Sequence, residues 1–408
     1  MNILFILPHI EKGGGQSIQA LNLAENLIKK NNKIYILTFR SKASGRELPR
    51  SFNKIPKYSY NIILNYSTVL VAPFLVGKVK KLVEDWKIDI IQSFDPHVSN
   101  FLAICLGKSL NLPVFCRIGG KHREFYEDRL LKGTFLQKFL YYIKIPSLLL
   151  MFLEYYTIKH THILISNCHY LLNSLKQSIL MKYLKFNWAV IPNGVDLERF
   201  SVNEEKTVSD LRDNRKRNIL LYVGRIEDYK GIDTLIQALD IVRQRFPQLY
   251  LLLVGNYHYN EKYYAKLQKM ITQLGVSQYV NFVGEKPHSE IPFYLQLAKI
   301  LILPSYSGAR PIYEGCPNVL LEAMASQRLV IASDIGGIPE VVQNNKTGLL
   351  FEPKESLQLA DLIILALENP EKFQELVANG RKFILENHAF EIIVKKYLAL
   401  YNRSLRIH

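Results

Sequence analysis

Short apolar runs alternate with amphipathic stretches along the whole chain, and this alternation constrains the fold more than any other feature. Residues 2–7 read as a strand, and the unbroken apolar run at 3–7 is typical of a strand buried on both faces. Residues 17–31 then carry apolar side chains at helical spacing. Repetition of this strand–helix unit predicts an α/β fold built on doubly wound parallel sheets.

The alternation runs in two series, separated by a polar, turn-rich segment near residues 192–217. Because 408 residues exceed what one core usually serves, we predict two domains, residues 1–195 and 196–389. The stretch from about 390 to 408 reads as a helix with no strand after it, and we expect it to pack back on the first domain. The expected strands are residues 2–7, 33–38, 89–93, 113–117 and 162–166, then 218–223, 249–254, 280–283, 300–303, 329–332 and 348–351.

Two glutamates, Glu314 and Glu322, flank an expected helix start in Tyr313-Glu-Gly-Cys-Pro-Asn318. Asn318 is the expected N-cap of this helix. The first amides of a helix have no partner within it and suit a phosphate group. Two carboxylates beside such a site can bind the hydroxyls of a sugar nucleotide. Taken alone, the pair is equally compatible with a surface helix that carries two incidental glutamates.

A second motif, Leu221-Tyr-Val-Gly-Arg225, ends an expected strand and is followed by Lys230 and Gly231. Ligands of doubly wound sheets bind at the carboxyl ends of strands, where Arg225 and Lys230 can neutralise a diphosphate. The alternative is two solvated surface cations. A glycine turn, Lys12-Gly-Gly-Gly-Gln16, follows the first strand but is not a dinucleotide-binding G-x-G-x-x-G motif.

Together these motifs resemble the retaining, nucleotide-sugar-dependent glycosyltransferases of family 4, also called group 1. The resemblance extends to Ile191-Pro-Asn-Gly-Val-Asp196, to Ser333-Asp-Ile-Gly-Gly337 and to Thr347-Gly-Leu-Leu-Phe351. It implies the GT-B fold, in which two Rossmann-like domains face a cleft. The first domain would bind the acceptor and the second the nucleotide-sugar donor.

The resemblance also implies roles for individual residues. Arg225 and Lys230 would bind the donor diphosphate, Glu314 the sugar hydroxyls, and Glu322 the ribose hydroxyls. The catalytic residues it implies are Glu314, Arg225, Lys230 and His122. The donor-binding residues are Gly14, Gly15, Gly224, Arg225, Lys230, Glu314, Gly315, Asn318, Val319 and Glu322.

The histidine assignment departs from the family pattern. Many relatives carry a histidine directly after the strand at 113–118, whereas here Ile118-Gly-Gly-Lys-His122 displaces it. His122 therefore competes with His97 for the catalytic role, and a surface histidine remains the alternative. Gln16 stands where relatives often have an acidic residue, which leaves the acceptor preference open.

The formal net charge of +16 is concentrated in the first half of the chain. Residues 1–200 hold 27 Lys and Arg against 13 Asp and Glu, while residues 201–408 hold 25 against 23. Residues 130–160 combine lysines with many aromatic and aliphatic side chains, which favours contact with an anionic membrane surface. A core helix is the alternative for this stretch. No nucleic-acid-binding motif is present, so no nucleic-acid partner is expected.

The resemblance implies a metal-independent hexosyl- or other glycosyltransferase without a cofactor. We expect it to use a UDP- or GDP-sugar and a lipid-linked or membrane-associated glycan acceptor, as in cell-surface polysaccharide or lipopolysaccharide biosynthesis. The expected location is cytoplasmic, at the inner face of the membrane, and four scattered cysteines without a C-x-x-C pair fit a reducing compartment. The alternatives are a GT-B enzyme acting on soluble substrates, such as an epimerase or sugar-phosphate transferase, and a non-catalytic nucleotide-sugar-binding scaffold.

Overall fold

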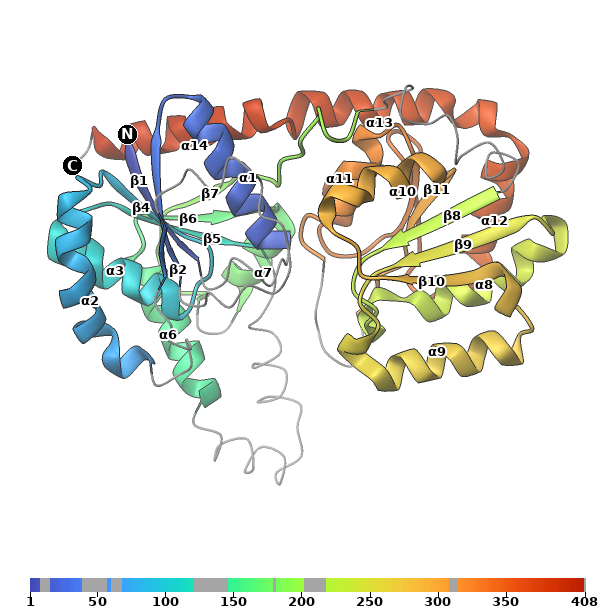
Figure 1. The fold of residues 1–408 in the computed structure, drawn as a ribbon, viewed down its shortest axis with the longest axis horizontal. Helices are drawn as coiled ribbons and strands as arrows, with labels where there is room; N and C mark the ends of the chain where they lie inside the picture. The colour runs from blue at the N-terminus through green and yellow to red at the C-terminus, as the bar shows by residue number, and fades with distance from the viewer. Residues whose placement is uncertain are drawn as a thin grey trace. The chain divides into compact units, whose positions relative to one another are not determined.

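The structure of the protein is a computed structural model, which describes residues 1–7, 15–38, 57–59, 68–119, 146–178, 181–201, 218–307 and 314–406. Two compact units divide the chain. The first comprises Met1–Asn193 together with Phe390–His408, and the second comprises Gly194–Ala389. Each unit is a parallel sheet with helices packed against it (Figure 1), which confirms the predicted α/β class.

The sheet of the first unit contains seven parallel strands. They are β1 (Asn2–Leu7), β2 (Lys33–Thr38), β3 (Lys57–Ser59), β4 (Ile90–Ser93), β5 (Val114–Ile118), β6 (Ile163–Ser166) and β7 (Trp188–Val190). Their order is β3-β2-β1-β4-β5-β6-β7, so the order reverses direction between β1 and β4. Residues 3–6 of β1 are completely buried because this central strand is covered on both faces.

Helices accompany these strands in the first unit, and all but the last of them connect two strands. They are α1 (Gly15–Lys29), α2 (Thr68–Asp85), α3 (Val98–Leu110), α6 (Pro146–His160), α7 (His169–Gln177) and α14 (Phe390–Leu405). Helix α1 begins two residues before the predicted start and buries Leu23, Ala24 and Leu27. Its apolar spacing therefore marks the face that packs on the sheet.

Helix α14 follows the second unit in the chain but packs in the core of the first. Phe390, Ile393 and Val394 are buried in one cluster with residues of β1, β2 and α1. The Tyr401 hydroxyl donates a 2.8 Å hydrogen bond to Oε1 of the buried Gln92 on β4. The first unit is thus built from two separate stretches of chain.

Helix α6 covers the described part of the stretch considered for membrane contact. Leu153 and Ile158 are buried, whereas Phe152 is 65% exposed. In residues 151–160 the helix therefore packs largely into the core, as the alternative interpretation proposed, and residues 130–145 lie outside the described ranges. Among the described residues, no helix is long and apolar enough to cross a membrane.

The second unit repeats this architecture. Its parallel strands are β8 (Asn218–Val223), β9 (Leu249–Val254), β10 (Val280–Gly284), β11 (Ile300–Leu303), β12 (Leu329–Ser333) and β13 (Leu349–Phe351). Their order is β10-β9-β8-β11-β12-β13, with the reversal between β8 and β11. The helices are α8 (Ile232–Arg245), α9 (Glu261–Gln273), α10 (Ile291–Leu297), α11 (Asn318–Ala325), α12 (Ser356–Glu368) and α13 (Gln374–Asn387). A ligand of such a sheet binds where the strand order reverses, so β8 and β11 locate the candidate site.

Gly231 fits the loop after β8 tightly against the loop after β11. Its φ is +69°, and a Cβ atom added there would lie 1.9 Å from the carbonyl oxygen of Pro304. The backbone N–H of Tyr306 also donates to the carbonyl of Tyr229 at 2.8 Å. These contacts fix the two loops relative to each other.

We predict that Gly231→Ala destabilises the protein more than Gly275→Ala does. Gly275 also has positive φ, +64°, but nothing lies within 4 Å of its added Cβ. In the control, Gly275→Ala, the free energy of unfolding should fall only by the cost of the left-handed conformation, about 1–2 kcal/mol. Gly231→Ala adds a backbone clash to this cost. Urea unfolding of both variants measures the difference, and equal losses would contradict the tight packing at Pro304.

Candidate functional site

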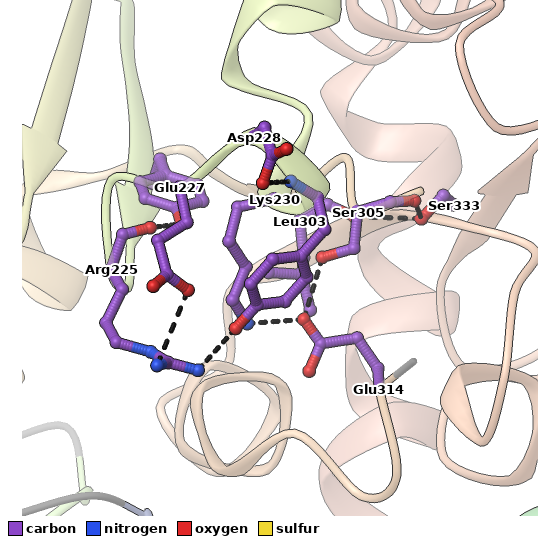
Figure 2. Close-up of polar contacts among 10 residues, drawn as sticks. Arg225, Glu227, Asp228, Lys230, Leu303, Ser305, Glu314 and Ser333 are labelled. Carbon is purple, nitrogen blue, oxygen red and sulfur yellow. Dashed lines mark hydrogen bonds and ion pairs between the residues drawn. The ribbon is translucent and has the colours of Figure 1, made fainter. Parts of the chain in front are cut away.

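Lys230 and Glu314 form an ion pair at the carboxyl-terminal edge of the sheet in the second unit. The Lys230 ammonium contacts Oε1 of Glu314, and the Ser305 hydroxyl donates to the same oxygen at 2.8 Å (Figure 2). The Lys230 and Glu314 side chains are only 13% and 12% exposed. Two residues singled out from the sequence therefore meet, although they lie 84 positions apart.

The loop after β8 holds Lys230 in place. Lys230 ends the 3-10 helix η4 (Asp228–Lys230), and its backbone N–H donates to the Glu227 carbonyl at 3.0 Å. Tyr229, in the middle of η4, is buried. With Gly231 packed on Pro304, the ammonium is presented from a fixed turn and not from a flexible surface loop.

The charge of Glu314 is set by two opposing effects. Burial disfavours its carboxylate and would raise its pKa. The Lys230 ammonium and the hydrogen bonds from Lys230 and Ser305 outweigh burial, and the pKa of Glu314 lies below its ordinary value. Glu314 is therefore ionised at neutral pH and carries the negative charge needed to accept hydrogen bonds from hydroxyl groups.

The backbone of Glu314 is held by the Asp-Ile-Gly-Gly337 segment after β12. The Gly337 N–H donates to the Glu314 carbonyl at 2.8 Å. Gly336 has φ of +66°, and an added Cβ would lie 2.4 Å from the same oxygen. These contacts explain why glycine stands at position 336, after β12.

Arg225 lies beside this pair, on the same loop as Lys230. Its guanidinium donates to the Tyr229 hydroxyl and lies 3.4 Å from Oε2 of Glu227 (Figure 2). The Arg225 side chain is 51% exposed, in contrast to the largely buried Lys230. A guanidinium that is held on one side and open on the other can bind phosphate oxygens.

The start of α11 differs from the prediction by one residue. Pro317 occupies the N-cap position, and Asn318 is the first helical residue. The prediction of Asn318 as the N-cap was therefore wrong. The helix still begins shortly after Glu314, so the backbone N–H of Val319 lies in the first turn, where amides have no partner within the helix.

Glu322 lies one turn into α11 and is 7% exposed. Its Oε1 is 2.8 Å from Nε2 of His288, the first residue of the 3-10 helix η7 (His288–Glu290). Nδ1 of His288 is in turn 3.2 Å from the Arg199 guanidinium. His288, Arg199 and Ser305 are contacts that the sequence analysis did not identify.

Each glutamate contacts other described residues through only one of its two carboxylate oxygens. Within the described part of the chain, Lys230 and Ser305 contact only Oε1 of Glu314, and His288 contacts only Oε1 of Glu322. Oε2 of each carboxylate has no hydrogen-bond partner among the described residues. The site therefore combines two fixed hydroxyl acceptors with Arg225, Lys230 and a helix start that can bind anionic oxygens.

Only some of the candidate site residues of the first unit lie in the described parts of the chain. Gly14 and His122 lie outside the described residues, and Gly15 is the first residue of α1. His97 follows β4, and its Nδ1 is 3.2 Å from Oδ1 of Asp95. Burial lowers the pKa of His97, but the hydrogen bond and charge of Asp95, with the charge of Glu154, outweigh it and raise the pKa above its ordinary value.

The described residues contain no group of three or more His, Cys, Asp or Glu side chains arranged to hold a metal ion. The four cysteines, which all lie in described segments, are free thiols. The remaining donor-binding candidates, Gly224 and Gly315, lie in the loops that carry Arg225 and Glu314.

Comparison with protein families matches each half of the chain. Residues 13–199 match the family described as Glycosyltransferase Family 4, and residues 203–383 match the one described as Glycosyl transferases group 1. The chain belongs to the family 4, or group 1, glycosyltransferases. Arg225, Lys230, Glu314 and Glu322 all lie within the second match, so the candidate site is part of the group 1 region.

Among individual relatives, a GDP-mannose-dependent α-(1-6)-phosphatidylinositol monomannoside mannosyltransferase from Mycobacterium tuberculosis is 31% identical over 210 residues. The alignment covers 50% of this chain and 53% of that protein. The chain thus spans about half the length of the first curated relatives it matches.

Solved structures match the whole chain. Sucrose-phosphate synthase from Thermosynechococcus elongatus has a TM-score of 0.79 at 21% identity, with 100% of both chains covered. Anabaena HepE in complex with UDP-glucose has a TM-score of 0.72 at 20% identity, again with 100% of both chains covered. This likeness establishes the GT-B fold that the sequence motifs predicted for this family 4 glycosyltransferase.

We predict that Lys230→Met costs about 3 kcal/mol of unfolding free energy at pH 7, because it leaves the buried Glu314 carboxylate without its cation. In the native protein the lowered pKa of Glu314 gives stability that is present above its unfolded pKa and is lost as pH falls through the folded pKa. Without the ammonium, burial dominates and raises the pKa of Glu314, so more of this buried carboxyl group is uncharged at pH 5 than at pH 7. Lys230→Met should therefore lose less unfolding free energy at pH 5 than at pH 7.

Urea unfolding at both pH values measures this loss. Adding Glu314→Gln to Lys230→Met should restore most of the stability, because the double variant buries no unpaired charge. The same loss at both pH values, with no recovery in the double variant, would contradict the charge pairing.

Proposed function

We propose that this protein is a retaining glycosyltransferase that transfers a sugar from a UDP- or GDP-linked donor to a hydroxyl group of a lipid-linked or membrane-associated glycan. The observation that carries the proposal is the arrangement of Lys230, Ser305 and Glu314 where the strand order of the sheet reverses. The alternatives are the same transfer to a soluble acceptor and a scaffold that only binds the nucleotide sugar.

Each group has a defined task in this reaction. The acceptor hydroxyl attacks the anomeric carbon of the donor sugar on the face from which the nucleotide diphosphate leaves, so the configuration is retained. The bond from that carbon to the diphosphate breaks, and the hydroxyl proton passes to an oxygen of the departing phosphate. Negative charge then grows on the departing phosphate, where Arg225, Lys230 and the first turn of α11 stabilise it. These groups neutralise the charge in this reaction without a metal ion.

The two glutamates orient the donor. Oε2 of Glu314 accepts hydrogen bonds from sugar hydroxyls, and Glu322 accepts them from the ribose. Lys230 serves both the sugar-binding and the phosphate-binding part of the donor site. Its ammonium neutralises the Glu314 carboxylate, which binds the sugar, and also faces the donor phosphate. A lysine has three donor hydrogens, so it can serve both.

Glu314→Gln should lower donor turnover about 100-fold or more, because it removes a charged acceptor that acts in the transition state. Nucleoside-diphosphate release from UDP-, GDP- and ADP-sugars measures this, with and without a bacterial lipid extract. Glu386→Gln, an exposed position on α13, is the matched control and should keep full activity.

Each outcome of that assay separates the candidates. Lipid-dependent release from one donor that is lost in Glu314→Gln supports transfer to a membrane-associated acceptor. Lipid-independent release points to a soluble acceptor. Nucleotide-sugar binding without release from any donor supports the scaffold, and normal turnover in folded Glu314→Gln refutes the site assignment.

For the membrane, we propose that the first unit makes peripheral contact through residues 176–178 and 181–188. Tyr183 and Trp188 are 84% and 46% exposed in this segment. The Lys176 ammonium lies 3.6 Å from the centre of the Trp188 ring, and Lys182 and Lys185 are exposed beside Tyr183. Aromatic rings with adjacent lysines suit the interface of an anionic bilayer.

Replacing Lys176, Lys182 and Lys185 with Gln should weaken binding to anionic vesicles on the order of 100-fold, at about 1 kcal/mol for each lysine. Co-sedimentation with phosphatidylglycerol vesicles measures the change, and neutral vesicles should show little binding. A control that replaces Lys262, Lys269 and Lys382 in the second unit removes the same charge and should bind nearly normally. If both triple variants lost the same affinity for anionic vesicles, the lysines would act through the general charge of the protein, and those of the first unit would not form a specific membrane-binding surface.

A further inference from the structure

His288 connects Glu322 to a part of the chain that lies far from it in sequence. Its Nε2 is 2.8 Å from Oε1 of Glu322 on α11, and its Nδ1 is 3.2 Å from Nη1 of Arg199. The His288 side chain is 22% exposed, and its ring packs 5.5 Å from that of Phe200. The ring is therefore held on three sides.

The contact with Arg199 assigns the proton on His288. A guanidinium can only donate hydrogen bonds, so Nδ1 must accept. The imidazole is then neutral with its hydrogen on Nε2, and this hydrogen is donated to the Glu322 carboxylate. His288 thus acts on Glu322 as a hydrogen-bond donor with a fixed direction.

Arg199 is itself fixed by the motif that precedes it. The backbone N–H of Arg199 donates to Oδ1 of Asp196 at 3.1 Å, and its Nε lies 3.9 Å from Oδ2 of the same carboxylate. Asp196 ends the Pro-Asn-Gly-Val-Asp segment that the sequence analysis quoted without a chemical role. A continuous series of contacts therefore leads from Asp196 through Arg199 and His288 to Glu322.

We propose that His288 is a positioning residue that orients Glu322 for the ribose of the donor nucleotide and so provides preference for ribonucleotides over deoxyribonucleotides. The inference rests on the proposed function. With Oε1 held by His288, Oε2 of Glu322 has one defined direction toward a ribose hydroxyl. A carboxylate free to rotate about its side-chain torsions would lose this orientation.

The test compares the affinity of wild-type protein for a ribonucleoside diphosphate with its affinity for the 2′-deoxy counterpart, by calorimetry. The two pairs are UDP with 2′-deoxy-UDP and GDP with 2′-deoxy-GDP. The wild type should bind the ribonucleotide of one pair more tightly. His288→Ala should weaken ribonucleotide binding about tenfold, which is the loss of one hydrogen bond to a charged group, and should change deoxynucleotide binding little.

His288→Gln is the conservative variant, because its side-chain amide can donate in place of the imidazole N–H. It should recover most of the preference for the ribonucleotide. Arg199→Met provides a second variant that leaves the ring and Glu322 in place, and it should lower the preference because Nδ1 loses its donor. This variant keeps the test available if His288→Ala does not fold.

Equal weakening of both nucleotides in His288→Ala and Arg199→Met, with no recovery in His288→Gln, would overturn the positioning role and indicate a structural one. Tight binding by wild type without preference for either sugar would also overturn it while leaving the proposed function standing. Failure of the wild type to bind any of the four nucleotides would refute the proposed function, and the inference with it.

Discussion

The ion pair between Lys230 and Glu314 is the interaction on which the site depends. It joins the loop after β8 to the loop before α11 across the point where the strand order reverses. The pair can form in a largely buried position because Ser305 adds a hydrogen bond to the same carboxylate oxygen. Without these contacts, burial would favour the protonated acid, and Glu314 would become a weaker acceptor for hydroxyl groups.

The two glutamates of the motif are supported by groups of different charge. Glu314 is held by an ammonium, so its own charge is largely balanced within the protein. Glu322 is contacted by the His288 imidazole, and no lysine or arginine among the described residues pairs directly with it. Two glutamates with seven residues between them thus present carboxylates of different electrostatic character to one ligand.

The sequence predicted those parts of the fold and the site that depend on local pattern and strand position. Arg225 and Lys230 follow an apolar strand, and parallel strands end at one edge, so the position of both cations near Glu314 could be expected. Ser305 follows β11 in the same way, and its position was the signal that could have identified it. The N-cap of α11 was misplaced by one residue because Asn is favoured there, whereas Pro317 occupies that position here.

Other features depend on contacts that no local pattern encodes. Strands β3 and β7 have only three residues each, and β7 ends just before the turn-rich segment near residues 192–217. His288 gains its role from Arg199, 89 positions away, and from Glu322 on a different helix. A lone histidine in a loop carries no sign of such partners.

The separation of the first unit into two stretches of chain has a consequence for synthesis. On the ribosome, residues 1–193 emerge first, but the core between β1, α1 and the tyrosines of α14 cannot close until residues 390–405 have emerged. The second unit is continuous and completes its own core earlier. The first unit, although it lies N-terminal, therefore cannot complete its core until the whole second unit has been translated, and the side of the sheet that α14 covers stays uncovered until then.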